Sequence, residues 1–164
     1  YTVGNTLSLH DALPIFAEAD AEFARAIELD PNEADAWAAL SDIAVLAGRV
    51  EEGLEHSRKA FRLNPFPPSW YYLTLGQAQY AAGDYEAAVE TLRRDETYRT
   101  SSRRFLAASL AQLGRLDEAR AEVELFLVGN PQFTIRHWAA TEPFRHAATL
   151  AHFVDGYRKA GLPE

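Results

Sequence analysis

One pattern recurs along this chain, a pair of amphipathic helices joined by a tight turn, and it limits the possible folds more than any other feature. In residues 34–65, Trp37, Leu40 and Ala44 recur at spacings of three and four, which is the spacing of one helix face. Gly48 then stands where a left-handed cap would end the first helix, and Pro65 closes the second. The segment predicts two antiparallel helices that need neighbours of the same kind to bury their apolar face.

Copies of this pattern precede and follow it. Ala19 stands 34 residues before Gly53, and three more pairs match at the same offset: Phe23 with Ser57, Ala26 with Ala60, and Pro31 with Pro65. Two later copies contain Tyr72, Leu75, Gly76, Gly83, Tyr85 and Ala88, then Leu106, Leu110, Gly114, Ala119 and Pro131. These residues and their period resemble the tetratricopeptide repeat (TPR). The resemblance implies an all-α fold, a TPR-like α-solenoid of stacked antiparallel helix hairpins.

The pattern divides the chain into three parts. Residues 6–15 look like one reading frame of a sequencing adapter, so we set aside residues 1–15 as a non-native or disordered segment. The array itself is expected to cover residues 16–131, as a half repeat at 16–32 and repeats at 34–65, 68–99 and 100–131. The second helix of residues 68–99 is expected to end early, near Arg94, because Asp95 stands where a small residue belongs.

The last part, residues 132–164, is expected to close the array. Residues 132–143 lose the helical period and predict an extended or irregular crossing segment. Pro143 is expected to mark the start of a C-terminal capping helix that Gly161 and Pro163 end. A solenoid needs such an element to cover its terminal apolar surface.

The tail carries a second resemblance. Residues 155–164, DGYRKAGLPE, together with Phe133-Thr134 and Glu142-Pro143-Phe144, resemble the C-terminal end of certain bacterial proteins. In those proteins a class III adenylate/guanylate cyclase domain precedes tetratricopeptide repeats. The resemblance implies the C-terminal regulatory region of a signalling protein. Because no catalytic domain is present, no cyclase residue can be assigned, and the repeat tail of a winged-helix transcriptional regulator is the alternative.

The repeat resemblance also implies a concave groove, lined by the first helix of each hairpin, that binds a peptide or protein. The matching positions are Asp35, Ala38, Asp42, Val45, Trp70, Leu73, Gln77, Tyr80, Arg104, Ala108 and Gln112. Trp70 and Tyr80 would be the best anchors, because aromatic residues dominate binding hot spots. The alternative is that both residues only pack against neighbouring repeats.

Charge and composition narrow the function classes. The formal net charge of −8 argues against a general nucleic-acid binder and favours a protein partner with some basic character, which another domain of the parent chain could supply. The chain has no Cys, which excludes disulfides, and no Met, so we expect a piece of a longer protein. No apolar run is long enough to cross a membrane, and we expect a cytoplasmic location.

Motifs for catalysis are absent from the sequence. No glycine-rich phosphate loop, H-E-x-x-H or G-x-S-x-G motif occurs, so we expect neither an enzyme nor a bound cofactor or metal. His137, His146 and His152 share no i, i+4 spacing, which indicates scattered histidines. A basic stretch could bind a phosphate or an acidic segment, or could simply be solvated: Arg93, Arg94, Arg99, Arg103 and Arg104. A self-associating array is a further alternative.

Overall fold

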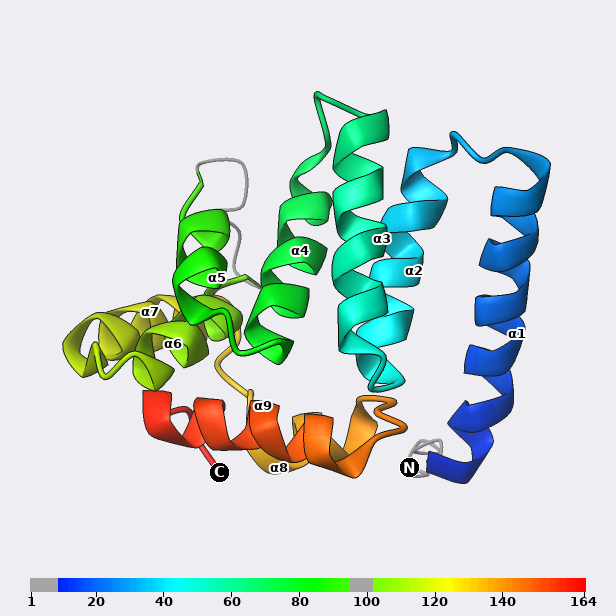
Figure 1. Cartoon of the computed structure of the whole chain (residues 1–164). Coiled ribbons are helices and arrows are strands. Elements are labelled where there is room, and N and C mark those ends of the chain that lie inside the picture. Colours follow the sequence, from blue (N-terminus) through cyan, green and yellow to red (C-terminus); the bar gives the residue numbers. More distant parts are fainter. Residues whose placement is uncertain (1–8, 95–101) are drawn as a thin grey trace.

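The computed structural model describes residues 9–94 and 102–164, with side chains from residue 18 onward. Within these residues the regular structure is entirely helical (Figure 1). The helices are α1 (Leu9–Leu29), α2 (Ala34–Leu46), α3 (Val50–Leu63), α4 (Ser69–Ala81), α5 (Tyr85–Leu92), α6 (Arg103–Gln112), α7 (Leu116–Gly129), α8 (Ile135–Thr141) and α9 (Ala147–Ala160). None of the helices in the described residues is both long and apolar enough to cross a bilayer.

Helices α2 to α7 form three antiparallel hairpins that stack side by side, with α1 packed against α2. The turn inside each hairpin has the same geometry, a glycine with positive φ: Gly48 at 82°, Gly83 at 81° and Gly114 at 74°. The residue after each glycine donates its N–H to a carbonyl five residues earlier, as Arg49 does to Ala44 at 2.8 Å. This geometry is the helix-ending turn expected from glycine. The predicted all-α solenoid of stacked hairpins is confirmed.

Small residues let the two helices of the first full hairpin cross closely. Gly53 of α3 lies so near α2 that an added Cβ would stand 3.0 Å from the carbonyl oxygen of Ser41. Beside this crossing, the hydroxyls of Ser41 and Ser57 lie 2.7 Å apart and satisfy each other in a fully buried position. Close packing of the hairpin therefore depends on residues that leave no room for larger side chains.

One helix boundary differs from the sequence prediction and another lies close to it. Helix α1 begins at Leu9, so it includes residues that we had set aside with the N-terminal segment; residues 1–8 lie outside the described residues. Helix α5 ends at Leu92, close to the end predicted near Arg94, while residues 95–101 are again outside the described residues.

The prediction of an extended segment at residues 132–143 was wrong, because Ile135–Thr141 forms helix α8. Thr134 caps this helix by accepting the N–H of His137 at 3.1 Å, and Ile135 and Trp138 bury its inner side. Two turns are too short to show a helical period in a sequence. Pro143 does not start the last helix either, because it lies in the connection before α9. Helix α9 begins at Ala147 and ends at Ala160, and Gly161 caps it with φ 91°.

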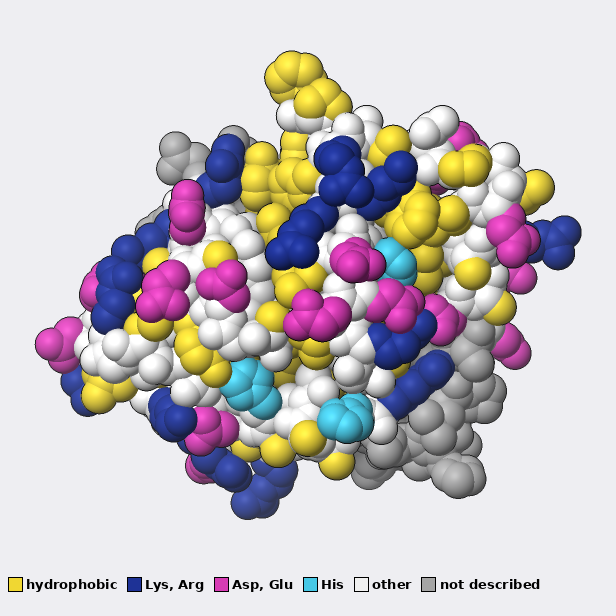
Figure 2. All heavy atoms as spheres, in the orientation of Figure 1, with side chains coloured by type: hydrophobic (Ala, Val, Ile, Leu, Met, Phe, Trp, Pro, Cys, Tyr) yellow, Lys and Arg dark blue, Asp and Glu magenta, His cyan; other side chains and the backbone are white. Residues whose placement is uncertain are grey.

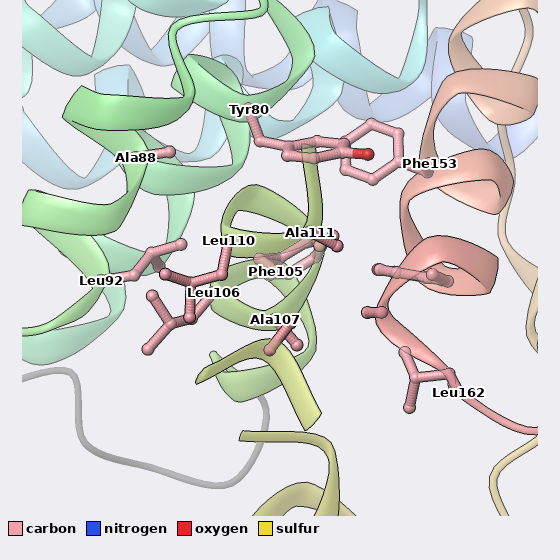
Figure 3. Close-up of a cluster of buried hydrophobic side chains, with 14 of the residues drawn as sticks. Tyr80, Ala88, Leu92, Phe105, Leu106, Ala107, Leu110, Ala111, Phe153 and Leu162 are labelled. Carbon is pink, nitrogen blue, oxygen red and sulfur yellow. The ribbon is translucent and has the colours of Figure 1, made fainter. Parts of the chain in front are cut away.

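Helix α9 lies beside α6 and crosses the ends of α2 and α4 (Figure 1). The main core forms where it meets the array, and Figure 3 shows Tyr80 of α4 and Phe105 of α6 directed toward Phe153 of α9. Phe153 and Tyr157 are fully buried there, so α9 is an integral wall of the core.

Candidate functional site

The inner face of the array consists of the first helices α2, α4 and α6, which lie next to one another. Hydrogen bonds between side chains connect them in three places. Tyr71 donates to Asp35 Oδ1 at 2.5 Å, Gln77 Nε2 donates to Asp42 Oδ1 at 2.9 Å, and Gln112 Nε2 donates to the Tyr80 hydroxyl at 3.4 Å. Five of the predicted groove residues therefore connect neighbouring repeats.

Helix α9 covers the part of this face that α6 and the end of α4 form. Tyr80 is fully buried, its hydroxyl donates to the carbonyl of His152 at 3.0 Å, and its ring is stacked on the His152 ring at 4.8 Å. Burial raises the pKa of Tyr80 well above its usual value. Tyr80 therefore fits the alternative in which it only packs within the chain, because α9 surrounds it.

Two other predicted groove residues also hold the tail. Arg104 Nε donates to the hydroxyl of Tyr157 at 3.2 Å, and Gln112 Nε2 donates to Asp155 Oδ2 at 3.1 Å. The backbones approach closely between them, since an added Cβ on Gly156 would meet Tyr80 and Ala108. The C-terminal half of the predicted groove thus binds an amphipathic helix from the same chain.

The other half of the inner face remains accessible. Trp70 is 37% exposed, with its ring edge-on to Tyr71 at 4.5 Å, while Asp35 is exposed and Leu73 is half-buried. Ala38 and Val45, in contrast, are buried in the core and offer little surface. Trp70, Leu73 and Asp35 are therefore the predicted groove residues that an external partner could reach.

A cavity of about 180 Å³ lies between the inner face and the tail. It is lined by Asp42, Leu46, Leu73, Thr74, Gln77, Arg104 and Phe105 of the array and by Trp138, Glu142 and Phe144 of the tail. Burial, together with the nearby Glu142 carboxylate, raises the pKa of Asp42 above its usual value, although Gln77 and Arg104 act in the opposite direction. The three tail residues were missed by the sequence analysis, because their segment was not expected to fold against the groove.

A larger, open cleft of about 530 Å³ separates α1 from the first full hairpin. Apolar residues such as Ile27, Trp37 and Leu40 form part of its wall, and Arg49 bridges Asp20 and Glu52 at 2.9 Å each. This cleft contains none of the predicted groove residues.

The histidines and the basic stretch are distributed among structural contacts. His152 lies between Tyr80 and Tyr85, and His146 Nδ1 lies 3.0 Å from the Thr149 hydroxyl. No group of three potential metal ligands occurs in the part of the chain that the structure describes. Arg93 pairs with Glu118, and Arg103 pairs with Glu122, so each takes part in an ion pair between helices; Arg99 lies outside the described residues.

Comparisons with known proteins agree with this architecture. Residues 50–125, from α3 into α7, match the sequence model of anaphase-promoting complex, cyclosome, subunit 3. A search of curated protein sequences finds no match. Among solved structures, two of MamA superpose with a TM-score of 0.61 at 21% and 20% identity, covering 88% and 91% of this chain and 86% and 82% of those chains.

A third solved structure is YrrB, described as a TPR protein with an unusual peptide-binding site. It superposes with a TM-score of 0.57 at 20% identity over 91% of this chain and 83% of that chain. The chain therefore has the fold of a tetratricopeptide-type helical solenoid. Proteins built on this repeat are typically binding modules for peptides or other proteins, as the resemblance in the sequence implied.

Proposed function

We propose that this chain is a non-catalytic protein–protein interaction module that binds a partner segment on the inner face of α2, α4 and α6. The observation that carries the proposal is α9 itself. Tyr80, Arg104 and Gln112 already hold an amphipathic helix on this face through contacts to His152, Tyr157 and Asp155. A surface that accepts one helix by apolar burial and a few polar contacts is suited to accept another of similar chemistry.

The accessible half of the face is the proposed partner site. Trp70 offers a large, half-exposed aromatic surface, Leu73 lies one turn further along α4, and Asp35 adds a negative charge from α2. The net charge of −8 favours a partner segment with basic residues around an apolar anchor. Such a partner could be a separate protein or another domain of the parent chain.

The proposal extends to the parent protein, which we place among bacterial cytoplasmic signalling proteins such as nucleotide cyclases. Its support is the tail sequence that resembles the end of such proteins. Residues of that ending pack against the array in this structure: Gly156, Tyr157 and Ala160 contact it, and Leu162 is buried. Sequencing the genomic DNA upstream of the chain tests this: a cyclase domain is expected, and a winged-helix domain would select the alternative.

The interaction itself is tested by affinity capture with the purified chain from lysate of the source organism, followed by measurement of the dissociation constant for the captured partner. Trp70→Ala combined with Leu73→Ala is expected to weaken binding by roughly 30-fold or more, the cost of removing hot-spot side chains. Val128→Ala is the matched control, because Val128 is 83% exposed on α7, away from this face. Unchanged binding by the double variant would refute the proposed site.

Self-association is a second candidate, favoured by one specific observation. Hydrophobic side chains gather at the top of the view in Figure 2, where the α3–α4 connection lies in Figure 1, and this connection carries Phe66 with 90% exposure. Light scattering distinguishes the two functions. A dimer that becomes a monomer on Phe66→Ser would support self-association, and a monomer at all concentrations would exclude it.

A further inference from the structure

The cavity between α2, α4, α6 and the tail contains groups of both charges in a small volume. Arg104 is the cationic group, while Asp42 and Glu142 are the two carboxylates, one from the array and one from the tail. The charges influence one another, because both Glu142 and Arg104 act on the pKa of Asp42. Leu46, Phe105 and Phe144 form apolar walls around them.

Several of these polar groups lack a complete set of partners. Trp138 is only 6% exposed, and its Nε1–H is buried without a hydrogen-bond acceptor. In the described part of the chain, no side chain forms a hydrogen bond or ion pair with the Glu142 carboxylate. Arg104 donates its Nε–H to the Tyr157 hydroxyl. A buried donor without an acceptor is costly, and the half-buried Glu142 carboxylate can still accept hydrogen bonds. These groups could pair with a molecule that supplies both an acceptor and a donor.

We propose that this cavity binds a small zwitterion of the α-amino acid type. The ligand's carboxylate accepts hydrogen bonds from the Arg104 guanidinium and the Trp138 Nε1–H, and its ammonium group donates to Asp42 and Glu142. Guanidinium groups hold carboxylates in a paired geometry, and an ammonium group offers three donors that two carboxylates can share. The apolar walls leave room for a short side chain.

Simpler ligands fit these groups less well. An anion without a cationic group would meet the two carboxylates Asp42 and Glu142 with nothing to neutralise them. A cation without an acceptor would leave both the Arg104 guanidinium and the Trp138 N–H without a ligand partner. The volume of about 180 Å³ exceeds the ~10–15 Å³ that one water needs, so several waters are the remaining alternative occupant.

The position of the cavity adds a consequence that can be measured. Trp138, Glu142 and Phe144 belong to the tail, whereas Asp42, Gln77 and Arg104 belong to the array. A ligand between them would connect the two, and it would stabilise α8 against local opening. Hydrogen exchange of the α8 amides therefore locates binding in this cavity and separates it from binding elsewhere.

The experiment is a thermal-shift and calorimetric titration of the purified chain with each of the twenty common amino acids. At least one amino acid is expected to raise the melting temperature saturably and to slow hydrogen exchange in α8. The amine and the carboxylic acid that each carry only one of its two charged groups are expected to bind about tenfold more weakly or worse. Equal binding of either compound would overturn the zwitterion assignment, and no saturable binder in the set would overturn the site.

Two variants locate the binding to the named groups. Glu142→Gln keeps the shape and removes the charge, and Trp138→Phe keeps a ring and removes the N–H; each is expected to weaken binding about tenfold or more. Glu124→Gln, on the exposed surface of α7, is the matched control and should bind as the unmodified chain does. If Trp138→Phe does not fold, the half-buried Glu142→Gln carries the test alone. Unchanged binding by Glu142→Gln would overturn the proposal.

Discussion

Replacing Gly156 with alanine should weaken the packing of α9 against the array. An ideal Cβ at this position would lie 1.8 Å from the Tyr80 hydroxyl, 2.9 Å from Tyr80 Cζ and 3.2 Å from Ala108 Cβ. The Tyr80 side chain cannot easily adopt another rotamer, because it is fully buried and its hydroxyl donates a hydrogen bond to the His152 carbonyl. Helix α9 must therefore move outward, which opens the core around Phe153.

The size of the effect follows from two opposing contributions. Overpacking a closely packed site costs roughly 1–3 kcal/mol. Alanine inside a helix is favoured over glycine by about 1 kcal/mol. Because the overlap with Tyr80 is severe, we expect Gly156→Ala to lower the free energy of unfolding by about 1–2 kcal/mol, an amount that lowers the melting temperature by a few degrees.

Urea denaturation followed by circular dichroism measures the stability, and the fluorescence of Trp138 reports on the tail, because this buried ring packs 4.7 Å from the ring of Tyr157. Tyr80→Phe supplies the matched test. Alone it should cost about 1 kcal/mol through the lost hydrogen bond to His152. Combined with Gly156→Ala it removes the nearest clashing atom, so the double variant should lose clearly less than the sum of the two. Strict additivity, or a more stable Gly156→Ala variant, would refute the reasoning.

Three further predictions follow from contacts in the array and the tail. Asp42→Asn should leave the stability at pH 7 unchanged or raise it, because the raised pKa of Asp42 means that its charged form is less favourable in the folded state than in the unfolded chain. Any gain in stability of the variant should shrink as the pH falls through that raised pKa. Denaturation at several pH values measures this. Ser57→Ala should cost about 1–3 kcal/mol, because it leaves the buried Ser41 hydroxyl without a partner, whereas replacing both serines by alanine should cost less; equal losses in denaturant would contradict this. Gly48→Ala and Gly83→Ala place alanine at φ 82° and 81°, so each should lower the free energy of unfolding by about 1–2 kcal/mol. Only Gly48→Ala should also loosen α9, because its Cβ would lie 2.7 Å from His146 Cβ. Equally fast hydrogen exchange of the α9 amides in both variants would exclude this effect.

The hairpins could be predicted from the sequence because their signals are local. A glycine such as Gly83 indicates a turn with positive φ at its own position. The apolar period of α2 to α7 extends over enough turns to be recognised. Helix α8 could not be recognised in the same way, because it has only two turns. Its helical state depends on the Thr134 cap and on burial of Trp138 against distant residues.

Helix α9 covers part of the surface that the sequence predicts as a groove. Tyr80 has the same position on α4 whether its neighbour is a partner protein or the tail. The helical period of the sequence therefore cannot distinguish these two neighbours. What decides is a contact with His152, which lies 72 residues further along the chain. Pairing of Asp42 with Gln77 is likewise a contact between repeats that no local pattern reports. Trp70, at the uncovered end, is the predicted anchor that remains accessible.

The placement of α9 also bears on the mechanics of the molecule. A stack of hairpins joined only to their neighbours behaves like a spring, because small rotations at each junction add up along its length. Here one straight rod is attached to three successive hairpins: the Arg145 N–H just before it donates to the Leu46 carbonyl at 2.9 Å, and the rod itself meets Tyr80 of the second hairpin and Arg104 of the third. Any change in the pitch of the stack would have to break one of these attachments. The tail thus holds the curvature of the array at a single value.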